Sequence, residues 1–216
     1  MQNHVQYQNL HLIKHPLIKH KISILRNKNT PSGIFRRLAE EITMLMIFEA
    51  LRDLETEEIS IETPLEKTTG EQIKGKKLVV MPVLRAGLAM VPAILQVIPS
   101  ARVGHIGLAR NEETLQPDCY YFKIPHSPEQ REFVVTDPML ATGGSAAFAI
   151  RKLKESGAQK IRLMSIIGAP EGVQKLEKEH PDVPVFLAQL DRQLNDKGYI
   201  LPGLGDAGDR MFGTVG

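Results

Sequence analysis

The sequence lacks several features that would place a protein in a special class. It contains no tryptophan, aromatic residues make up only 5% of it, and a single cysteine, Cys119, excludes an internal disulfide. It also lacks an apolar run near the roughly 20 residues that a membrane-spanning helix needs, and its amino-terminal segment is polar, unlike a signal peptide. We therefore expect no membrane segment, and we expect a cytoplasmic protein, because lone thiols suit a reducing compartment.

The chain also lacks an excess of charge of either sign. Its 27 lysine and arginine residues nearly balance its 25 aspartate and glutamate residues, which gives a formal net charge of +2. Proteins that neutralise the phosphates of DNA or RNA generally carry a basic face or a cluster of lysine and arginine. The near-neutral charge gives no support for such a face, so we expect small-molecule partners and no nucleic acid.

The length of 216 residues and the hydrophobic content of 42% suit a single domain over 1–216. Apolar runs predict strands and helical periodicity predicts helices, and the two alternate along the chain. The expected strands are 78–84, 101–108, 132–135, 161–167 and 183–188, and the expected helices are 34–54, 88–97, 145–156 and 171–180. This alternation predicts an α/β fold with a mostly parallel, twisted sheet flanked by helices.

The stretch Phe133-Val-Val-Thr-Asp-Pro-Met-Leu-Ala-Thr-Gly-Gly-Ser145 is the most informative part of the sequence. A short β-forming run leads into a turn of small residues, and a helical pattern follows. Small residues let backbone N–H groups close around a phosphate, and the helix N-terminus adds partial positive charge. Asp137 stands at the strand end, where a carboxylate can accept hydrogen bonds from sugar hydroxyls. These features indicate a phosphorylated sugar, and an ordinary strand–helix connection without a ligand is the alternative.

Two arginines follow other predicted strands. Arg85 stands in Pro82-Val-Leu-Arg-Ala-Gly87, and Arg110 closes the run Val103-Gly-His-Ile-Gly-Leu-Ala-Arg110. Open α/β sheets bind ligands beyond the carboxyl ends of their strands, and a guanidinium fork suits a pyrophosphate better than an ammonium group does. The alternative for each arginine is a solvated residue at a turn. The segment 112–129, which contains several prolines, is expected to be a long mobile loop near this edge.

Glycine dominates the segment Gly198-Tyr-Ile-Leu-Pro-Gly-Leu-Gly-Asp-Ala-Gly-Asp-Arg210. Its G-x-G-x-x-G spacing matches a dinucleotide fingerprint, but we expect no such unit, because too few residues follow for the helix and second strand that the fingerprint needs. Because glycines have no side chains, they leave the backbone exposed, and exposed backbone can bind a planar ligand through main-chain donors and acceptors. A plain turn is the alternative.

Together with the run His15-Pro-Leu-Ile-Lys-His-Lys21, these motifs resemble the type I phosphoribosyltransferases, in particular the uracil branch of that family, over about 11–216. The resemblance includes Leu-Arg-Ala-Gly-Leu, Gly-His-Ile-Gly-Leu-x-Arg, Asp-Pro-Met-Leu-Ala-Thr-Gly-Gly-Ser and Gly-Tyr-Ile-x-Pro-Gly-Leu-Gly-Asp-Ala-Gly-Asp-Arg. Many members of the broad family carry two adjacent acids where this chain has Thr136-Asp137. The uracil branch commonly keeps only the second acid, so the departure favours that branch.

The resemblance implies transfer of the phosphoribosyl group of 5-phosphoribosyl 1-pyrophosphate (PRPP) to N1 of uracil, which yields UMP and pyrophosphate in pyrimidine salvage. It implies Mg²⁺ as the cofactor, bound mainly through PRPP with no protein ligand assigned, and a homodimer or larger homo-oligomer. The apolar stretch 43–51 is our candidate for a subunit interface. The implied fold adds a small hood built from the chain termini to the parallel sheet, and GTP binding is a further property that the resemblance suggests.

The resemblance also assigns roles to individual residues. Catalytic roles are assigned to Arg85, Arg110, Asp137 and Asp206, and the last of these is a candidate general base. PRPP binding is assigned to the same four residues together with Pro138, Met139, Leu140, Ala141, Thr142, Gly143, Gly144 and Ser145. Uracil binding is assigned to Ile200, Gly205, Asp206 and Ala207, where main-chain groups would meet the acceptor–donor–acceptor edge of the base.

Two alternative functions remain for such a chain. A pyrimidine-sensing regulator that binds RNA would need a basic face, which the charge balance does not favour. A phosphoribosyltransferase for orotate would favour an extra cation in the loop 199–209, which contains none, and a purine is the other candidate base. The histidines His4, His11, His15 and His20 raise the question of a metal site, but no acid or cysteine accompanies them. We expect them in a solvated or subunit-contacting arm.

Overall fold

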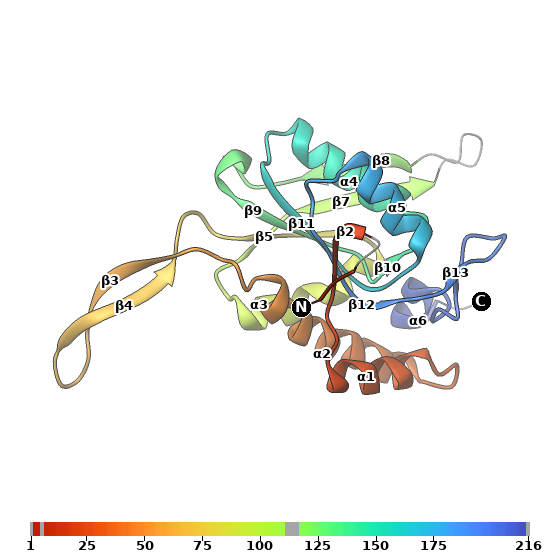
Figure 1. Ribbon diagram of the computed structural model, residues 1–216, viewed down its shortest axis with the longest axis horizontal. Helices are drawn as coiled ribbons and strands as arrows, with labels where there is room; N and C mark the ends of the chain where they lie inside the picture. Colours follow the sequence, from red (N-terminus) through yellow and green to blue (C-terminus); the bar gives the residue numbers. More distant parts are fainter. Residues whose placement is uncertain (1, 5–6, 111–116, 215–216) are drawn as a thin grey trace.

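A computed structural model of the chain describes residues 2–4, 7–110 and 117–214. These residues form a ten-stranded sheet through the middle of the molecule (Figure 1). Its main path runs β1 (Gln2–His4), β2 (Tyr7–Leu12), β12 (Val185–Leu190), β11 (Lys160–Gly168), β9 (Glu132–Thr136), β5 (Val79–Leu84), β7 (His105–Arg110) and β8 (Pro117–Lys123). Off this path, β10 (Met139–Leu140) pairs with β11 and β6 (Arg102–Val103) pairs with β5. The pairings from β2 to β7 are parallel and the two edge pairings are antiparallel, which confirms the predicted mostly parallel sheet.

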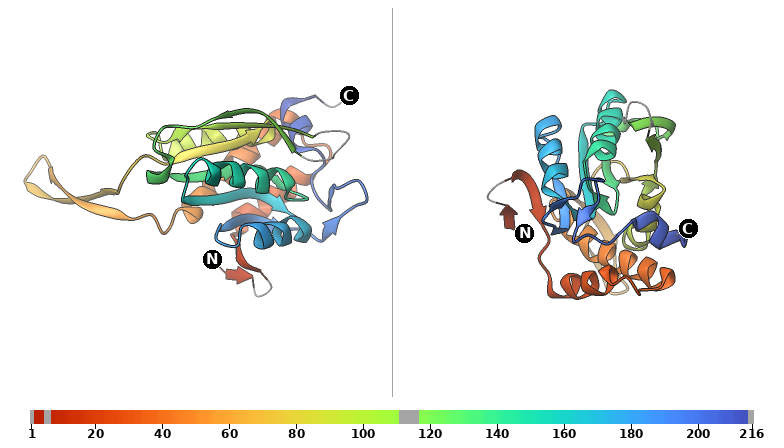
Figure 2. Two further views of the ribbon diagram at one scale, coloured as in Figure 1. Left: turned by 90° about the horizontal axis from the view of Figure 1, so that it is seen from above. Right: turned by 90° about the vertical axis from the view of Figure 1, so that its right-hand side faces the viewer.

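Helices cover both faces of the sheet (Figure 2). On one face pack α4 (Gly144–Glu155) and α5 (Pro170–Glu179), and on the other pack α1 (Pro16–Arg26), α2 (Ser32–Ala50) and α3 (Val91–Val97). Successive side chains of a strand point to opposite faces, so Val134 of β9 joins the core with α2 while Phe133 and Val135 join the core with α4. Burial on both faces explains why the central strands are mostly apolar, and why β5 is apolar along its whole length.

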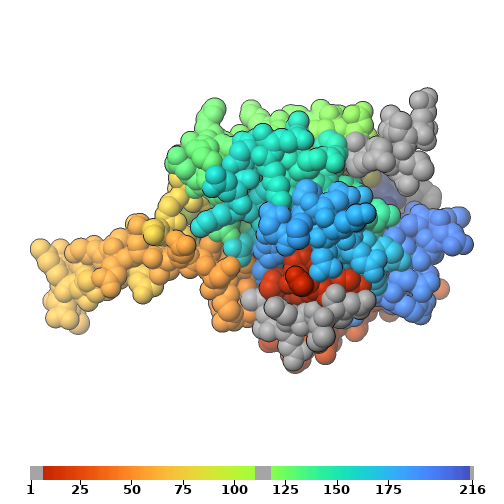
Figure 3. All heavy atoms as spheres, turned by 45° about the horizontal axis from the view of Figure 1, so that its top comes forward, coloured from red at the N-terminus to blue at the C-terminus, as the bar shows by residue number. Residues whose placement is uncertain are grey.

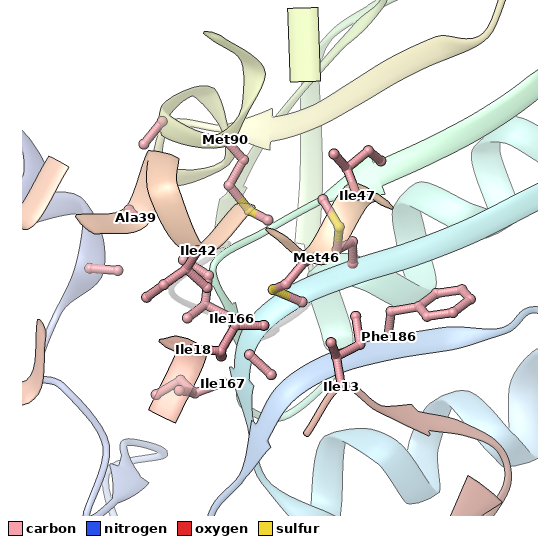
Figure 4. Packing of buried hydrophobic residues seen from close by; sticks show 14 of the residues in the cluster. Ile13, Ile18, Ala39, Ile42, Met46, Ile47, Met90, Ile166, Ile167 and Phe186 are labelled. Carbon is pink, nitrogen blue, oxygen red and sulfur yellow. The ribbon is translucent and has the colours of Figure 1, made fainter. Parts of the chain in front are cut away.

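Helix α2 supplies much of the first of these two cores. Its Ile42, Met46 and Ile47 are fully buried and belong to the same hydrophobic cluster as Ile166 and Ile167 of β11 (Figure 4). Each such side chain contributes roughly 1.5–3 kcal/mol when it is fully buried. This face of α2 is therefore part of the hydrophobic core and is not free to contact another subunit.

The stretch 43–51, which we expected at a subunit interface, lies largely in the same core. Its Met46, Ile47 and Ala50 are fully buried, whereas Met44 and Phe48 are 37% and 68% exposed. Residues that alternate in this way along a helix belong to opposite faces. We therefore restrict the expected contact surface on α2 to Met44 and Phe48.

Elements from both chain termini form a hood beyond the carboxyl ends of the parallel strands. The short strands β13 (Gln193–Leu194) and β14 (Ile200–Leu201) pair with each other, and α6 (Ala207–Phe212) packs against α2. Arg36 of α2 donates from Nη1 to the carbonyl of Met211 at 2.8 Å. This assembly, on the right of Figure 1, is the hood that the family resemblance implies.

A hairpin that the sequence pattern does not predict projects from the opposite end of the molecule (Figures 1 and 3). It consists of β3 (Thr56–Glu62) and β4 (Lys67–Ile73), which pair antiparallel with Ile59 opposite Gly70. Most of its residues are polar and exposed, so neither an apolar run nor apolar–polar alternation marks it as a strand. An isolated two-stranded hairpin is only marginally stable in water.

Helix α1 is also absent from the predicted elements, which place no helix in the histidine-rich segment. A proline inside a helix opposes it, but a proline at the start does not. Pro16 occupies the first helical position, where its missing N–H costs nothing, and the preceding His15 accepts a hydrogen bond on Nδ1 from the Leu17 N–H at 3.2 Å. Pro16 therefore favours the start of a helix at this position, although it would break a helix that began earlier in the chain.

The prediction of a long mobile loop over 112–129 is wrong for its described part. Residues 117–123 form the edge strand β8, and η2 (Pro128–Gln130) is a short 3₁₀ helix. Residues 112–116 of that prediction lie outside the described residues. Within the described ranges, no helix is both long enough and apolar enough to cross a membrane.

Candidate active site

Several of the predicted motifs meet at one edge of the sheet. Strands β5, β9 and β12 belong to one parallel array, so their carboxyl ends lie on the same side. Arg85 follows β5, Asp137 follows β9, and β10 leads into Gly143. The hood lies at this edge, at the end of the molecule opposite the β3–β4 hairpin (Figure 1). Open α/β sheets bind their ligands in this position.

The turn between β10 and α4 is built from backbone and small side chains. Gly143 has a φ of +77°, which favours glycine, and it precedes α4 without a side-chain cap. A Cβ on Gly143 would lie 2.9 Å from the carbonyl oxygen of Gly172 in α5. A Cβ on Gly172 would lie 2.5 Å from the carbonyl oxygen of Ala141. The two glycines therefore let the turn rest directly on α5.

The residues 141–145, here called the phosphate turn, suit an anion. The first N–H groups of a helix lack partners within the helix and carry partial positive charge. Thr142 is exposed, and its Oγ1 accepts a hydrogen bond from the Gly144 N–H at 3.4 Å. Ser145 adds a second, partly exposed hydroxyl in the first turn of α4. Amides and hydroxyls in this arrangement can bind a phosphate group.

Asp137 lies between the end of β9 and β10. Its N–H donates to the carbonyl of Met164, and its Oδ1 accepts from the N–H of Met139, each at 3.3 Å. Burial is the main reason why the pKa of the Asp137 carboxyl is raised from 3.8 to about 7; the Met139 hydrogen bond opposes the rise, and the charge of Asp206 adds to it. A buried carboxyl near neutrality is typical of a functional site, and a ligand with hydroxyl donors would complete its hydrogen bonds.

We expect Asp137→Asn to stabilise the unliganded protein at alkaline pH. Because the pKa of Asp137 is higher in the folded state, its contribution to stability is complete below the unfolded pKa and is lost as the pH rises through about 7. At pH 8 the native protein carries a desolvated charge that asparagine lacks. Since one pKa unit corresponds to about 1.4 kcal/mol, we expect a gain in unfolding free energy on the order of 1–3 kcal/mol.

Urea unfolding of both proteins at pH 8 and pH 5 measures this gain. The wild-type carboxyl is protonated in the folded state at pH 5, so the difference between the two proteins should shrink there. An equal difference at both pH values would show that the charge of Asp137 is not its cause.

Arg85 emerges from the end of β5 with its side chain 61% exposed. Its Nη2 lies 3.7 Å from Oδ1 of Asp209 in α6, and the peptide bond before it is cis. Behind it, Gly87 in η1 (Ala86–Met90) lies so close to the end of β9 that a Cβ would overlap the carbonyl oxygen of Thr136. Exposed ion pairs contribute little, so an incoming anion can replace Asp209 beside the guanidinium.

The glycine-rich residues 200–207, here called the hood loop, connect β14 to α6. Gly203 and Gly205 have φ values of +62° and +80°, and a Cβ on Gly203 would overlap the carbonyl oxygen of Ile200. Asp206 caps α6 by accepting a backbone N–H of the first turn on Oδ1 at 2.9 Å. Gly205 and Asp206 are exposed, whereas Ile200 and Ala207 are buried. The loop therefore combines open main chain with apolar support.

The segment that leads into the hood loop lies beside the phosphate turn, and Asp206 of the loop lies near Asp137. The charge of Asp206 contributes to the pKa of Asp137, and a Cβ on Gly198, between β13 and β14, would lie 3.8 Å from Cγ2 of Thr142. Arg110 ends β7, which pairs with β5, but its side chain lies outside the described residues. The structure thus brings Arg85, Asp137, the phosphate turn and the hood loop together, while the side chain of Arg110 stays a prediction.

Pro138 and Leu140 differ from the phosphate turn that follows them. The Pro138 carbonyl accepts from two N–H groups of β11 at 3.1 Å each, and the Leu140 carbonyl accepts from the Ala169 N–H at 2.9 Å. Both residues are buried, and Met139 lies between them in β10. Since these carbonyls are occupied within the sheet, we expect ligand contacts of this run to lie mainly at Asp137 and 141–145.

Three residues at this edge are absent from the predicted set: Asp191, Asp209 and Arg210. Asp209 is the partner of Arg85, and the other two hydrogen-bond to the backbone of the hood loop. Asp191 directly follows an apolar strand, as Asp137 does, and this was the available signal. Its partner in the hood is distant in sequence, so no local pattern could assign its role.

The amino-terminal histidines have roles of their own. His11 stacks on Phe186 with 4.9 Å between ring centroids, and burial lowers its pKa. His15 caps α1, His20 is exposed on the same helix, and the side chain of His4 lies outside the described residues. In the part of the chain that the structure describes, no three His, Cys, Asp or Glu side chains are grouped to hold a metal ion.

Comparisons with known proteins agree with this geometry. A family model described as uracil phosphoribosyltransferase matches residues 12–214. Uracil phosphoribosyltransferases of Bacillus thuringiensis (strain Al Hakam) and Bacillus mycoides (strain KBAB4) are each 58% identical over 205 residues, which cover 95% of this chain and 98% of theirs. A solved structure of an Aquifex aeolicus protein aligns with a TM-score of 0.89 at 38% identity, covering 94% of this chain and 97% of that one. An adenine phosphoribosyltransferase from Trypanosoma brucei shares the fold, with a TM-score of 0.58 at 13% identity over 92% of this chain and 88% of that one.

Proposed function

Since the chain belongs to the uracil phosphoribosyltransferase family, we propose that its site transfers the phosphoribosyl group of PRPP to N1 of uracil, with UMP and pyrophosphate as products. One observation carries this proposal: the phosphate turn, the buried acid Asp137 and the open main chain of the hood loop lie together at one edge of the sheet. The turn and the acid suit a phosphorylated sugar, and the loop suits a planar base.

The reaction breaks the bond between the anomeric carbon of ribose and the pyrophosphate oxygen, and it forms a bond from that carbon to N1. Negative charge grows on the pyrophosphate as the first bond breaks. Arg85, exposed at the mouth of the site, is placed to neutralise it, and we assign the same role to Arg110 at the end of β7. The N1 proton must also leave uracil, and Asp206 is our candidate for its acceptor.

Asp137 and the phosphate turn would fix the two ends of the sugar. The turn binds the 5′-phosphate, and the Asp137 carboxylate accepts hydrogen bonds from the ribose hydroxyls. Hydrogen bonds donated to a carboxylate favour its charged form, so PRPP should lower the pKa of Asp137 from its unliganded value of about 7. Two anchors hold the anomeric carbon in line with the base and remove much of the entropic cost of the reaction.

We propose Mg²⁺ as the cofactor, carried mainly by PRPP. Mg²⁺ is usually held by one or two carboxylates together with substrate phosphates rather than by a cage of protein ligands. The described residues fit this arrangement, because they place Asp137 near enough to Asp206 for the charge of one to affect the other. When bound, the ion would neutralise the departing pyrophosphate.

The two alternative functions suit this site less well. Orotate would need a cation for its carboxylate, and Arg210, which directly follows the loop 199–209, already donates to the carbonyls of Leu204 and Asn27. An RNA-binding regulator would need a basic surface, and the 27 basic and 25 acidic residues leave little excess charge for one.

Conversion of uracil to UMP tests the proposal directly. Purified protein incubated with uracil, PRPP and Mg²⁺ should release UMP and pyrophosphate in equal amounts, measured after chromatographic separation. A chelator should stop the reaction, and added Mg²⁺ should restore it. The absence of UMP under these conditions would reject the proposal.

Arg85→Ala is expected to lower kcat/KM for PRPP by about tenfold to a few hundredfold. Hydrogen bonds to charged groups contribute roughly 1.5–3 kcal/mol, and here they strengthen as charge moves onto the pyrophosphate. Arg52→Ala is the matched control, because Arg52 is similarly exposed and paired with Glu49 but follows α2. Near wild-type kinetics in Arg85→Ala would show that Arg85 is a solvated surface residue that does not bind pyrophosphate.

We also propose that the enzyme acts in the cytoplasm as a homodimer or larger assembly. Met44 and Phe48 on α2 are exposed, and the β3–β4 hairpin exposes Leu65 at 95% and Ile73 at 52%. Contact with a second copy would stabilise a hairpin that is marginal alone. Sedimentation equilibrium measures the assembly, and GTP binding stays a prediction of the family resemblance.

A further inference from the structure

A buried carboxylate outside the predicted site holds the hood loop. Asp191 follows β12, and its side chain is only 2% exposed. Its Oδ2 accepts a hydrogen bond from the Gly203 N–H at 3.0 Å, and its Oδ1 lies 2.5 Å from Nη2 of Arg26. Its own N–H donates to the carbonyl of Gly168 in β11 at 2.8 Å. Asp191 therefore ties the hood loop to the central sheet.

Arg26 brings a third element into this contact. It is the last residue of α1, and its side chain is 20% exposed. Removing one member of a buried ion pair leaves the other charge uncompensated. The position of Asp191 and its hydrogen bond to Gly203 should therefore depend on Arg26.

Gly203 is the residue at which the hood loop turns. Its φ of +62° and its closeness to the carbonyl of Ile200 leave no room for a side chain and little for movement. Ile200 precedes this turn, and Gly205 and Asp206 follow it. A hydrogen bond that fixes Gly203 therefore fixes the main chain on both sides, where uracil is assigned.

The second half of the loop has a separate support. Arg210 lies over the Phe35 ring with 4.4 Å from its guanidinium carbon to the ring centroid. It donates to the carbonyl of Leu204 at 2.8 Å and to that of Asn27 at 2.6 Å. Loss of the Asp191 contact should therefore loosen the hood loop while α6 stays in place.

We propose that Asp191 and Arg26 are positioning residues for uracil, acting through Gly203 on the main chain that contacts the base. The proposal rests on the proposed function, since that function assigns uracil to the hood loop. Asp191 is too deeply buried to meet the base itself. The phosphate turn is supported by α5 instead, so the pair should affect uracil binding much more than PRPP binding.

The test compares Asp191→Asn and Arg26→Lys with Glu132→Gln as a matched control. Asparagine keeps an acceptor for the Gly203 N–H but loses the charge that pairs with Arg26. Lysine keeps the charge of Arg26. Glu132 forms a comparable pair with Arg162, whose side chain is 9% exposed, but it starts β9 and so lies at the other end of that strand from the site.

We expect Asp191→Asn to raise the KM for uracil roughly ten- to hundredfold, while the KM for PRPP changes by less than about threefold. Arg26→Lys should raise the KM for uracil by about threefold or less, because it preserves the charge. Glu132→Gln should lower the melting temperature and leave both constants near their wild-type values. Equal changes in both KM values in Asp191→Asn, or the same uracil effect in Glu132→Gln, would overturn the proposal.

Amide hydrogen exchange supplies a readout that needs no activity. Exchange over 200–206 should be faster in Asp191→Asn than in the wild type, while exchange over 137–147 should not change. If the wild-type protein makes no UMP, the proposed function fails, and exchange still tests whether Asp191 holds the loop. If Asp191→Asn does not fold, Arg26→Met replaces it, and unchanged exchange over 200–206 in Arg26→Met would overturn the proposal.

Discussion

Gly143→Ala is expected to lower kcat/KM for PRPP by about two to three orders of magnitude. The left-handed φ of +77° costs alanine roughly 1–2 kcal/mol, and its Cβ would lie 2.9 Å from the Gly172 carbonyl oxygen. The turn must shift away from α5 to relieve this contact, so its amides no longer point at one phosphate. Losing two hydrogen bonds to a charged group, at roughly 1.5–3 kcal/mol each, accounts for the expected loss.

Gly157→Ala separates this effect from backbone strain in general. Gly157 also has a positive φ, +95°, but it follows α4 at the end away from the site, and the nearest atom to a Cβ there is 3.9 Å away. Gly157→Ala should lower the melting temperature and leave the steady-state kinetics close to those of the wild type. If both variants lost activity equally, or if Gly143→Ala kept it, the phosphate turn would not be the site of PRPP binding.

Cytosine is expected to react about 10²- to 10⁴-fold less efficiently than uracil. We assign a main-chain carbonyl of the hood loop to the N3–H of uracil and a main-chain amide to its O4. Cytosine reverses both, because its N3 is an acceptor and its 4-amino group a donor. Each unsatisfied buried group costs roughly 1–3 kcal/mol, and sites built on hydrogen bonds reject mismatched partners strongly. Initial rates with each base at saturating PRPP give the ratio.

Gly205→Val tests whether the base lies on this loop. Gly205 is exposed with a φ of +80°, so valine would both strain the backbone and block close approach to it. Activity should fall for every base, without a switch towards cytosine. Gly75→Val is the control, because Gly75 has a φ of +83° and nothing within 4 Å of a Cβ, beside the β3–β4 hairpin. Unchanged uracil kinetics in Gly205→Val would place the base elsewhere.

Local signals in the sequence predict much of this molecule. The apolar run 78–84 and the mostly apolar segment 161–167 correspond to β5 and β11, because strands buried on both faces are rich in apolar residues. The phosphate turn is equally local, since a glycine with positive φ, an acid at a strand end and a helix start are adjacent in sequence. Parallel topology then brings the separate motifs to one edge.

Features that depend on distant residues are not predictable in this way. The β3–β4 hairpin is exposed along both of its strands, so its sequence carries no pattern of burial. The raised pKa of Asp137 arises from packing around it and from Asp206, far along the chain. The contact of Asp191 with Gly203 likewise exists only once the hood has closed over the sheet.

Competition among free bases tests the central claim most directly. The enzyme is given limiting PRPP with Mg²⁺ and equal amounts of uracil, cytosine, orotate, hypoxanthine and adenine, and the nucleotides formed are separated and quantified. We predict that UMP makes up nearly all of the product, with each other nucleotide below about 1% of it. Efficient formation of a purine nucleotide or of orotidylate would contradict the assignment of uracil to the hood loop, and no nucleotide at all would contradict the site itself.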